Sequence, residues 1–444
     1  MTMHYLKKAD PPEQSVDTDT ANVVANLLAE IQRDGEDAVR RCNRDFDGWQ
    51  GDILVDRLEL ESSGRRLPQS VKADLEFARD RVRDFAKYQR DSMQEFETEF
   101  GDGVVLGQRL VPVATAGCYV PGGRYAHVAS AIMSICTARV AGVPNVIAAT
   151  PAHGDRGIHP AILYAMHLSG ATQVLAAGGV QGIAALAYGI GTNRPADIIV
   201  GPGNRFVAEA KRQLFGRIGI DVIAGPTENL IIADDSADPA IIAADLAGQA
   251  EHGVDSPVWL ITTSQEIGDE VLGIIPNVIA ALPEPARTVA GTAWQDYGEI
   301  VIADDRDEAC RISDQYAPEH LQVQAKDLDF WLQTLRNYGS LFLGEETTVA
   351  FGDKCSGPNH ILPTKGAARY SGGLSASKFV KVLSYQRLTR DAAHELAPVA
   401  ARISRLEGME GHARTGDVRV HKYFPDESFE LEPAAVDWNP GAGE

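Results

Sequence analysis

The hexapeptide GQAEHG, residues 248–253, ends a segment of alanine and branched aliphatic residues that has the character of a buried helix. Gln249 and His252 are three positions apart, so on a helix they would share one face, and Glu251 would point away from it. An amide oxygen and an imidazole on one face could hold a metal ion. Polar residues also end many helices because the last turn meets water, so the hexapeptide alone leaves both interpretations open.

A second polar stretch, YAPEHL at residues 316–321, places Glu319 beside His320 after a proline, where a predicted helix gives way to a predicted strand. Side chains in irregular backbone of this kind can both point into one cleft, and a carboxyl beside an imidazole can then serve as an acid/base pair. An ordinary surface pair is the alternative interpretation of these two residues.

Two later stretches add candidate ligands. The segment FGDKCSGPNHILPT, residues 351–364, is loop-like and carries Asp353 and His360 among glycines and prolines, and long polar loops are often functional. The segment LEGMEGHA, residues 406–413, carries His412 in a predicted helical region. Asp353 and His412 would complete, with the pair in GQAEHG, a set of oxygen and nitrogen donors for a borderline divalent metal. Each of them alone could equally be a satisfied polar residue.

Three glycine-rich turns each follow a predicted strand and precede a predicted helix: YVPGG at 119–123, AAGGVQG at 176–182 and VGPGN at 200–204. A helix N-terminus offers unpaired N–H groups and a positive dipole, and glycine lets a ligand approach the backbone, so such turns suit a phosphate. None of them matches GxGxxG, the fingerprint of the standard dinucleotide-binding fold. A nucleotide site and a plain tight connection are both open for each turn.

The composition restricts the possible partners. The chain of 444 residues carries 62 acidic and 41 basic residues, a net charge of −21, which argues against nucleic acid and anionic membranes because both reward clustered Lys and Arg. A small anionic substrate would need only a local positive pocket. The five cysteines are scattered without a CxxC pair, and neither a signal-peptide core nor an apolar run long enough to cross a bilayer occurs, so we expect a reducing cytoplasmic location.

Short aliphatic strands alternate with helices from about residue 103 to 225, and again from residue 229 to about 343. Serial alternation of this kind is the signature of a parallel sheet covered on both faces. We therefore expect an α/β protein with two Rossmann-like parallel-sheet domains, incomplete and possibly duplicated. A helical segment at residues 18–100 would precede them, and the chain after residue 375 would be mostly helical.

Taken together, these stretches resemble the histidinol dehydrogenase family. The resemblance runs from about residue 20 to 422. The motifs, all in family order, are YVPGG, GGVQGIAALAYG, VGPGN, AGPTE, QAEHG, PEHL, GDKCSGPNHILPT, ARYSGGLS and EGMEGHA. The resemblance implies a homodimeric, zinc-containing, NAD-dependent enzyme that oxidises a primary alcohol to a carboxylate in two hydride transfers.

By the match of these motifs, the resemblance implies roles for individual residues. The zinc ligands would be Gln249, His252, Asp353 and, from a C-terminal segment swapped between the subunits, His412. The acid/base pair would be Glu319 and His320. The residues in contact with NAD would be Tyr119, Gln181 and Asn204. The residues in contact with the substrate would be Thr227, His360 and Glu407.

The resemblance also implies how the chain divides into parts. The expected parts are an N-terminal arm (1–20), a discontinuous larger α/β domain with the metal and catalytic residues (21–118 and 229–374), an inserted NAD-binding Rossmann-like domain (119–228), a helical C-terminal dimerisation segment (375–430) and a mobile acidic tail (431–444). The swap of the C-terminal segment would bring each His412 to the site of the other subunit.

Several features depart from the histidine-biosynthetic members of the family. The stretch after PGG, which is small and rich in Thr and Pro in those members, here reads RYAHVASAIMS and brings Arg124 and His127 beside the expected site. AGPTE has Thr227 where AGPSE is usual, and segments such as LFLGEETTVAFGDK resemble a branch of the family that contains sulfopropanediol dehydrogenases. Arg124 and His127 would suit a sulfonate, because charge-assisted contacts are strong. Alternatively, Arg124 pairs with one of the many surface carboxylates.

We therefore expect the substrate to be a small anionic polyol, 2,3-dihydroxypropane-1-sulfonate, oxidised to 3-sulfolactate. Histidinol is the alternative substrate, and His360 and Glu407 favour it because in the family they help to hold histidinol. Two functions from other classes are open on the sequence alone. One is a zinc hydrolase, since a metal, a Glu and a His suffice to activate water. The other is a non-catalytic, metal-stabilised binding protein.

Overall fold

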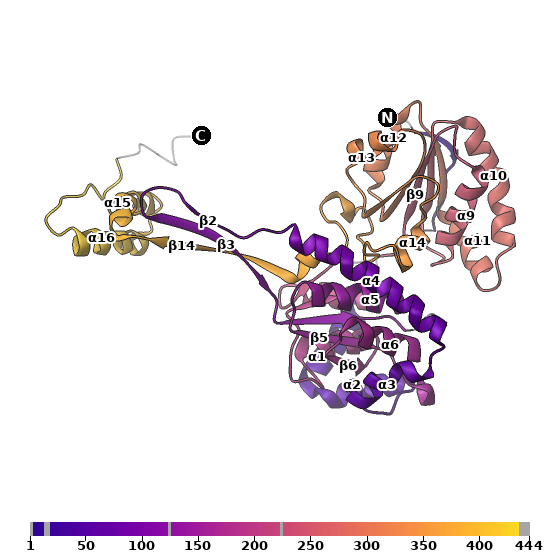
Figure 1. The fold of residues 1–444 in the computed structure, drawn as a ribbon, viewed down its shortest axis with the longest axis horizontal. Coiled ribbons are helices and arrows are strands. Elements are labelled where there is room, and N and C mark those ends of the chain that lie inside the picture. Colours follow the sequence, from indigo (N-terminus) through magenta and orange to yellow (C-terminus); the bar gives the residue numbers. More distant parts are fainter. Residues whose placement is uncertain (1–2, 13–17, 123–125, 223–224, 435–444) are drawn as a thin grey trace. The chain divides into compact units, whose positions relative to one another are not determined.

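The computed structural model describes residues 3–12, 18–122, 126–222 and 225–434, and the chain divides into two compact units (Figure 1). The first unit comprises residues 1–92 and 112–380, and the second comprises residues 93–111 and 381–444. The first unit contains two sheets whose strands alternate with helices, so the α/β class predicted from the sequence is confirmed.

The first sheet is parallel throughout and has the strand order β6-β5-β4-β7-β8. Its strands are β4 (Thr115–Tyr119), β5 (Asn145–Thr150), β6 (Gln173–Ala176), β7 (Ile198–Val200) and β8 (Gly219–Ile220). The helices between them are α5 (Val128–Val140), α6 (Pro160–Ser169), α7 (Gly179–Tyr188) and α8 (Arg205–Leu214). Strand β4 is buried along its whole length, because helices on both faces leave a parallel sheet no side that meets solvent.

The second sheet has the order β1-β11-β10-β9-β12-β13, and all its neighbours are parallel except β1, which pairs antiparallel with β11. Its strands are β1 (His4–Lys7), β9 (Asn229–Ala233), β10 (Val258–Thr262), β11 (Gly298–Ile302), β12 (His320–Gln324) and β13 (Ser340–Leu343). Its helices are α9 (Pro239–Ala250), α10 (Gln265–Ala280), α11 (Ala286–Tyr297), α12 (Arg306–Tyr316), α13 (Leu328–Thr334) and α14 (Val349–Lys354). Part of the predicted N-terminal arm is thus an edge strand.

Both parallel sets have the same topology. When the five parallel strands of each sheet are numbered in chain order, both read 3-2-1-4-5. This is a Rossmann-like order that lacks its sixth strand, as the sequence analysis expected. The strand order reverses between β4 and β7 in the first sheet and between β9 and β12 in the second.

The N-terminal helices differ from the predicted grouping. The predicted larger domain joined residues 21–118 to 229–374, whereas in the structure Val24, Leu28 and Ile31 share a core with Ile183 of α7, and β4 belongs to the first sheet. These helices are α1 (Thr18–Asp34), α2 (Glu36–Cys42), α3 (Arg57–Ser62) and α4 (Gln69–Asp91). An apolar helix face shows that a helix packs but not on which sheet, so the sequence could not decide this point.

The second unit is a three-stranded sheet followed by a helical hairpin. The strand order is β14-β3-β2, with β2 (Phe96–Glu99), β3 (Val104–Pro112) and β14 (Val380–Leu388), and the helices are α15 (Arg390–Leu406) and α16 (Glu410–Tyr423). The C-terminal segment was expected to be mostly helical, yet VKVLSYQRL forms β14; its β-branched and aromatic residues are typical of a strand. Of the predicted mobile tail, residues 435–444 lie outside the described residues. In the described ranges, no helix is both long enough and apolar enough to cross a membrane.

Candidate functional site

The predicted acid/base pair lies at the amino end of β12. Helix α12 stops at Tyr316 because Ala317 adopts a left-handed conformation, and Pro318 prevents the helix from resuming. His320 is then the first residue of the strand, and its Nδ1 lies 2.9 Å from the backbone oxygen of Glu228 and 3.5 Å from Oε2 of Glu319. Strand register places His320 beside Asn229 of β9, so the pair flanks the point where the strand order of the second sheet reverses.

Glu228 and Glu319 fix each other through reciprocal hydrogen bonds. The backbone N–H of Glu228 donates to Glu319 Oε2 at 3.0 Å, and the N–H of Glu319 donates to Glu228 Oε2 at 3.3 Å. The other carboxyl oxygen of Glu228 accepts from the N–H of Lys365 at 2.6 Å. The side chain of Glu319 is therefore held in one position beside His320. Thr227, expected to contact the substrate, directly precedes Glu228 and is half-buried.

Asp353 and His360 join the same cluster from the loop-like stretch. Asp353 Oδ1 lies 3.4 Å from His320 Nε2, which has no hydrogen-bond partner among the described residues. His360 Nδ1 lies 3.0 Å from the backbone oxygen of Asp353, and its Nε2 lies 2.9 Å from Oγ of Ser130 in the first turn of α5. Five residues of three separate motifs, Glu228, Glu319, His320, Asp353 and His360, are thus brought together, and Ser130 connects them to helix α5 of the first sheet.

Burial and the neighbouring charges set the protonation of this cluster. Burial raises the pKa of Glu319 from 4.5 to about 8, against the opposing charge of His320. Burial disfavours charge on His320 as well, but the carboxylates of Glu319 and Asp353 outweigh it and raise the pKa of that imidazole to about 9. Burial would also raise the pKa of Asp353, yet His320 holds it well below its usual range. At pH 7 Asp353 is therefore charged, His320 is protonated and Glu319 is largely neutral.

Gln249 and His252, the pair from which the metal hypothesis started, lie at the end of α9. The helix begins at Pro239, where Asp238 caps it by accepting from the N–H of Ala240 at 2.8 Å, and it ends at Ala250. Gln249 is buried, and its Nε2 has no hydrogen-bond partner in the described part of the chain. Burial lowers the pKa of His252, while the charge of Asp353 acts in the opposite direction, which places the two side chains in one neighbourhood.

The glycine turns lie at the carboxyl end of the first sheet. The hydroxyl oxygen of Tyr119, at the end of β4, accepts from the N–H of Gly179 at 3.0 Å, and Nε2 of Gln181 donates to Asp47 Oδ2 at 3.1 Å. Asn204 caps α8, since its Oδ1 accepts from the N–H groups of Phe206 and Val207 at 3.0 and 3.1 Å. All three residues expected to contact NAD thus belong to strand–helix turns, and the turns after β4 and β7 flank the reversal in strand order, where ligands of such sheets bind.

A buried ion pair fixes the turn after β7. Lys211 of α8 and Asp221 are ion-paired, with side chains 2% and 0% exposed. Asp221 Oδ2 accepts from the N–H of Gly201 at 2.7 Å, and Lys211 Nζ donates to the oxygen of Gly201 at 3.0 Å. Gly201 has a φ of +124°, and a Cβ at this position would collide with the backbone oxygen of Tyr119. Only glycine fits this close approach of two chain segments.

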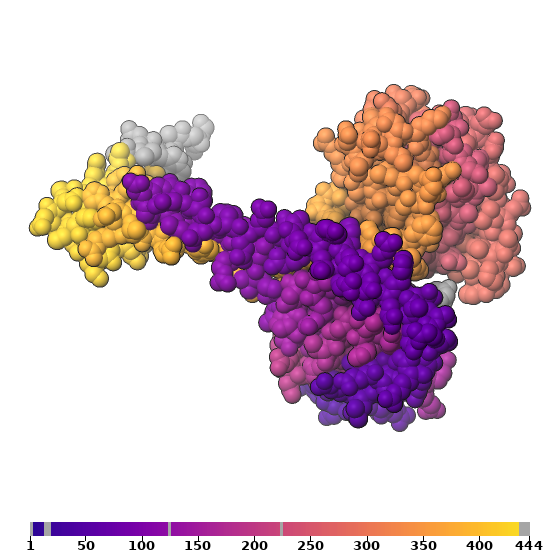
Figure 2. Space-filling view, in the orientation of Figure 1, coloured from indigo at the N-terminus to yellow at the C-terminus, as the bar shows by residue number. Residues whose placement is uncertain are grey.

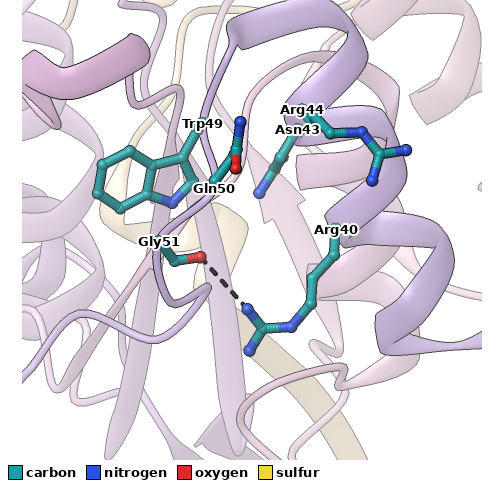
Figure 3. A pocket seen from close by; sticks show the side chains of 6 residues that line it. All are labelled: Arg40, Asn43, Arg44, Trp49, Gln50 and Gly51. Carbon is teal, nitrogen blue, oxygen red and sulfur yellow. Dashed lines mark hydrogen bonds between the residues drawn. The ribbon is translucent and has the colours of Figure 1, made fainter.

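A small open cavity of about 230 Å³ lies beside the π-helical turn Asn43–Asp47, which follows α2 (Figure 3). The residues that line it are Arg40, Asn43, Arg44, Trp49, Gln50 and Gly51. Asn43 donates to the backbone oxygen of Ala176 at 2.8 Å, and Asp47 of the same turn accepts from Gln181. The turn is therefore tied to the AAGG segment from the side of the N-terminal helices.

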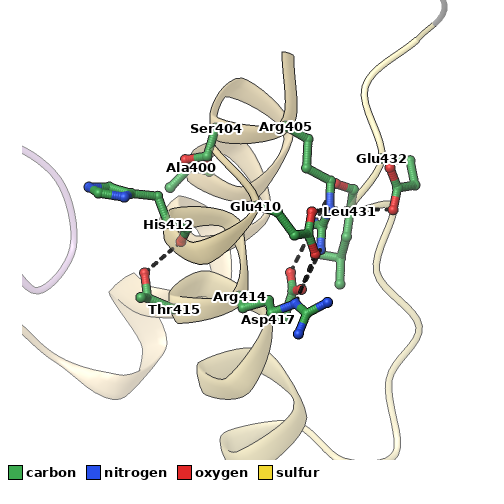
Figure 4. Close-up of polar contacts among 10 residues, drawn as sticks. All are labelled: Ala400, Ser404, Arg405, Glu410, His412, Arg414, Thr415, Asp417, Leu431 and Glu432. Carbon is green, nitrogen blue, oxygen red and sulfur yellow. Dashed lines mark hydrogen bonds and ion pairs between the residues drawn. The ribbon is translucent and has the colours of Figure 1, made fainter. Parts of the chain in front are cut away.

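Glu407 and His412, expected to act with the residues above, belong to the second unit. Glu407 ends α15 and His412 lies in the first turn of α16; both are exposed. Arg405 binds Asp417 at 2.6 Å and Glu410 at 3.0 Å, which holds the two helices together. In Figure 4 the side chain of His412 points away from these ion pairs. The hairpin thus presents His412 on its surface.

Comparison with known proteins identifies the family of this chain. The sequence profile of the family described as histidinol dehydrogenase matches residues 11–420. The chain belongs to the histidinol dehydrogenase family. It is accordingly an NAD-dependent oxidoreductase of the class that oxidises an alcohol to an acid with transfer of four electrons.

Individual relatives cover almost the whole chain. A histidinol dehydrogenase homolog of Pelagibacter ubique is 55% identical over 95% of this chain and 99% of its own length. The sulfopropanediol 3-dehydrogenase of Ruegeria pomeroyi is 51% identical over 97% of this chain and 99% of its own length. The crystal structure of histidinol dehydrogenase from Elizabethkingia anophelis superposes with a TM-score of 0.87 at 31% identity, covering 93% of this chain and 94% of its own.

The family implies zinc, and the donors in the first unit fit it. Gln249, His252 and Asp353 offer an amide, a neutral imidazole and a charged carboxylate, which are the donor types a divalent transition metal takes. Nε2 of the buried Gln249 amide has no hydrogen-bond partner among the described residues, as expected for an amide whose oxygen binds a metal ion. Within the described ranges, no group of three His, Cys, Asp or Glu side chains could hold a metal. Of the three expected ligands in the first unit, only His252 and Asp353 are of these four residue types.

Arg124 and His127 were predicted to bind the anionic group of the substrate. Arg124 lies outside the described residues. His127 directly precedes α5 as its N-cap residue and is half-buried, and burial lowers the pKa of its imidazole. The structure also places in or beside the cluster three residues that were not predicted from the sequence: Ser130, Glu228 and Lys354. Glu228 could have been found as the buried acid that ends AGPTE, and Lys354 as the cation beside Asp353, whereas Ser130 gave no signal.

Proposed function

We propose that the protein is a zinc-containing, NAD-dependent dehydrogenase that oxidises 2,3-dihydroxypropane-1-sulfonate to 3-sulfolactate. The similarity to the sulfopropanediol 3-dehydrogenase, 51% identical over 97% of the chain, carries this proposal. Balanced for the primary alcohol, the reaction consumes two NAD and one water and gives a carboxylate, two NADH and three protons. The buried cluster around His320 supplies the groups that such a reaction needs.

We assign the metal and cofactor as follows. Zinc would be held by Gln249, His252 and Asp353 together with His412 of a second copy, and it would orient the alcohol and polarise the reacting carbon–oxygen bond. NAD would be held by Tyr119, Gln181 and Asn204 and would accept the two hydrides. The substrate would contact Thr227, His360, Arg124 and His127 and, from a second copy, Glu407.

In this mechanism the chain's own residues move the protons. Nδ1 of His320 is engaged with the backbone oxygen of Glu228, so in the neutral form of this imidazole Nε2, which has no hydrogen-bond partner in the described chain, is the atom that takes the hydroxyl proton. Glu319, fixed by Glu228, then accepts in its carboxylate form a proton from the water that adds to the aldehyde. Both residues are almost fully buried, which keeps bulk water from the aldehyde between the two oxidations.

The proposal includes a homodimer in which the C-terminal segments are exchanged. Leu396, Val399, Ile403 and Leu406 of α15 are spaced three or four residues apart and therefore lie on one helix face, yet they are 40–58% exposed. The surface formed by helices α15 and α16 is yellow in Figure 2. A second copy would cover this apolar face, since such faces mark interfaces. A cytoplasmic location stays a prediction; the described cysteines are all free thiols.

Histidinol is the second candidate substrate. The similarity to the histidinol dehydrogenase from Elizabethkingia anophelis favours it, as does His360, which lies within the cluster. A side-by-side assay of NADH formation with histidinol and 2,3-dihydroxypropane-1-sulfonate, using zinc-loaded protein, separates the two. We expect turnover of the sulfonate. Turnover of histidinol with none of the sulfonate would reverse the assignment, and absence of NADH with either alcohol would contradict both.

A further inference from the structure

Lys354 is a cation at the edge of the buried cluster that none of the roles above uses. It is the last residue of α14, and its side chain is 61% exposed. Its Nζ lies 4.0 Å from Asp353 Oδ2, which is an ion-pair distance but too long for a hydrogen bond. The three N–H groups of the ammonium therefore have no close acceptor among the described residues, although the charge lies next to the groups that would hold the metal and substrate.

The other basic residues near the cluster lie beside its carboxyl groups. The ring nitrogens of His320 lie 3.5 and 3.4 Å from carboxyl oxygens of Glu319 and Asp353. Lys365 acts on the carboxyl of Glu228, to which its backbone N–H donates at 2.6 Å. For an anion entering this cluster, Lys354 is thus a cation without a hydrogen-bonded acceptor in the described chain.

The negative groups of the cluster do not rule out an anion. Burial raises the pKa of both Glu319 and Glu228, so these carboxyls carry less charge than exposed ones would. Asp353 is charged, and zinc would neutralise it. With a net charge of −21 the chain as a whole repels anions, so an anionic substrate needs a local cation.

The first turn of α5 reaches the same part of the cluster as Lys354. Ser130 is in contact with His360, and His360 is in contact with the backbone oxygen of Asp353, the residue before Lys354. Helix α5 is 13 residues long, no side chain caps its N-terminus, and Ser130 of its first turn contacts His360, so the positive end of its dipole lies near the cluster. An ammonium group and a helix N-terminus together make a suitable pair for an oxyanion of three oxygens.

We propose that Lys354 is the specificity-determining residue of this site and binds the sulfonate or carboxylate group of a small anionic alcohol, assisted by His127 and the first turn of α5. This inference rests on the proposed function, because it takes the cluster around His320 as the reaction site. It extends that function by naming the residue that selects an anionic substrate over a neutral or cationic one such as histidinol.

Binding and turnover of three ligands with one carbon skeleton test the role of Lys354. The ligands are 2,3-dihydroxypropane-1-sulfonate, 2,3-dihydroxypropanoate and glycerol, and the proteins are the zinc-loaded wild type, Lys354→Met and Lys354→Arg. Lys326→Met is the matched control, because Lys326 is another exposed lysine paired with an aspartate, Asp235, at 2.9 Å. Calorimetry gives the Kd of each ligand, the NADH assay gives kcat and KM, and metal analysis gives the zinc content.

We expect Lys354→Met to weaken sulfonate binding about 10- to 100-fold, the usual effect of losing a charge-assisted contact. KM should carry most of this change, the preference for sulfonate over glycerol should fall by the same factor, and Lys354→Arg should restore much of it. Weaker binding of the carboxylate than of the sulfonate in the wild type would show that the site is matched to three oxygens, and the reverse would assign it to carboxylates. Lys326→Met should behave as the wild type does.

Three results distinguish a failure of the proposed role of Lys354 from a failure of the proposed reaction. Sulfonate binding by Lys354→Met equal to that of the wild type overturns the inference, whether or not NADH is formed. An equal loss for the sulfonate and glycerol, together with loss of zinc, also overturns it, because Lys354 would then act by positioning Asp353. If the wild type forms no NADH from any alcohol while its sulfonate binding depends on Lys354, the proposed function fails and the anion site stands.

Discussion

Loss of the positive charge of Lys211 should destabilise the first sheet and its glycine turn together. In Lys211→Met the chain keeps an apolar side chain of similar length, but the carboxylate of Asp221, 0% exposed, retains only the N–H of Gly201 at 2.7 Å. A buried charge left without its partner costs about 3–5 kcal/mol. At about 2–4 °C per kcal/mol for a domain of this size, the melting temperature should fall by roughly 6–20 °C.

The same substitution should weaken NAD binding, because Asp221 binds the backbone N–H of Gly201 and Lys211 binds its backbone oxygen. The turn that ends in Asn204 then loses its anchor. The double variant Lys211→Met/Asp221→Leu separates the two effects. Replacing both charges by apolar groups removes the unpaired carboxylate, so stability should largely return, whereas the turn stays unanchored and the Kd for NAD should remain at least several-fold higher.

Urea unfolding followed by circular dichroism measures the first effect, and calorimetry with NAD measures the second. Arg212→Met is the control, since Arg212 is the next residue on α8 and pairs with Glu209 at 2.6 Å with its own side chain 56% exposed. That surface pair should contribute about 0–1 kcal/mol to the free energy of unfolding. If Lys211→Met costs no more than Arg212→Met, or if the double variant binds NAD like the wild type, the anchoring role of the ion pair is refuted.

Three further outcomes follow from the site and the second unit. Burial raises the pKa of Glu319 from 4.5 to about 8, and the carboxylates of Glu319 and Asp353 raise that of His320 to about 9, so the basic forms of both residues accumulate as pH rises. We expect kcat/KM for the alcohol to rise with pH and to level off above about 9, and Glu319→Gln should remove the part of the rise that Glu319 causes. An unchanged profile in Glu319→Gln would contradict the assignment. His252→Ala should lower the zinc content and abolish NADH formation; full zinc occupancy in this variant would remove His252 from the ligand set. Ile403→Glu, which places a charge on the exposed stripe of α15, should shift the protein from dimer to monomer in light scattering, and an unchanged mass would show that another surface makes the dimer.

The sequence predicted the local chemistry better than the packing. Glu319 and His320 could be recognised from their position after a proline at the end of a helix, since such backbone brings adjacent side chains together. Gln249 and His252 could be placed on one helix face from their spacing alone. By contrast, the approach of Asp353 to His320 across 33 positions of chain depends on the register of β12 and on the short helix α14, which no local pattern encodes.

Other features were missed for reasons that are equally physical. Glu228 precedes the aliphatic strand NLIIA, and a carboxyl before a strand normally faces water; only the reciprocal bonds with Glu319 make it part of the cluster. Lys354 was not predicted because an exposed lysine in a polar segment is usually solvated, and only its distance of 4.0 Å from Asp353 Oδ2 connects it to the cluster. The strand VKVLSYQRL was taken into a mostly helical segment, since its partner β3 lies almost 270 positions earlier in the chain.

The two sheets use opposite edges. In the first, the glycine turns lie at the carboxyl ends of the strands; in the second, His320 and Asn229 mark the amino ends. The carboxyl edge of the second sheet is consequently left to exposed connections such as residues 304–305 and 326–327. These loops are places where the chain can be opened for circular permutation or can carry an inserted tag or reporter domain while the reaction centre at the other edge keeps its geometry.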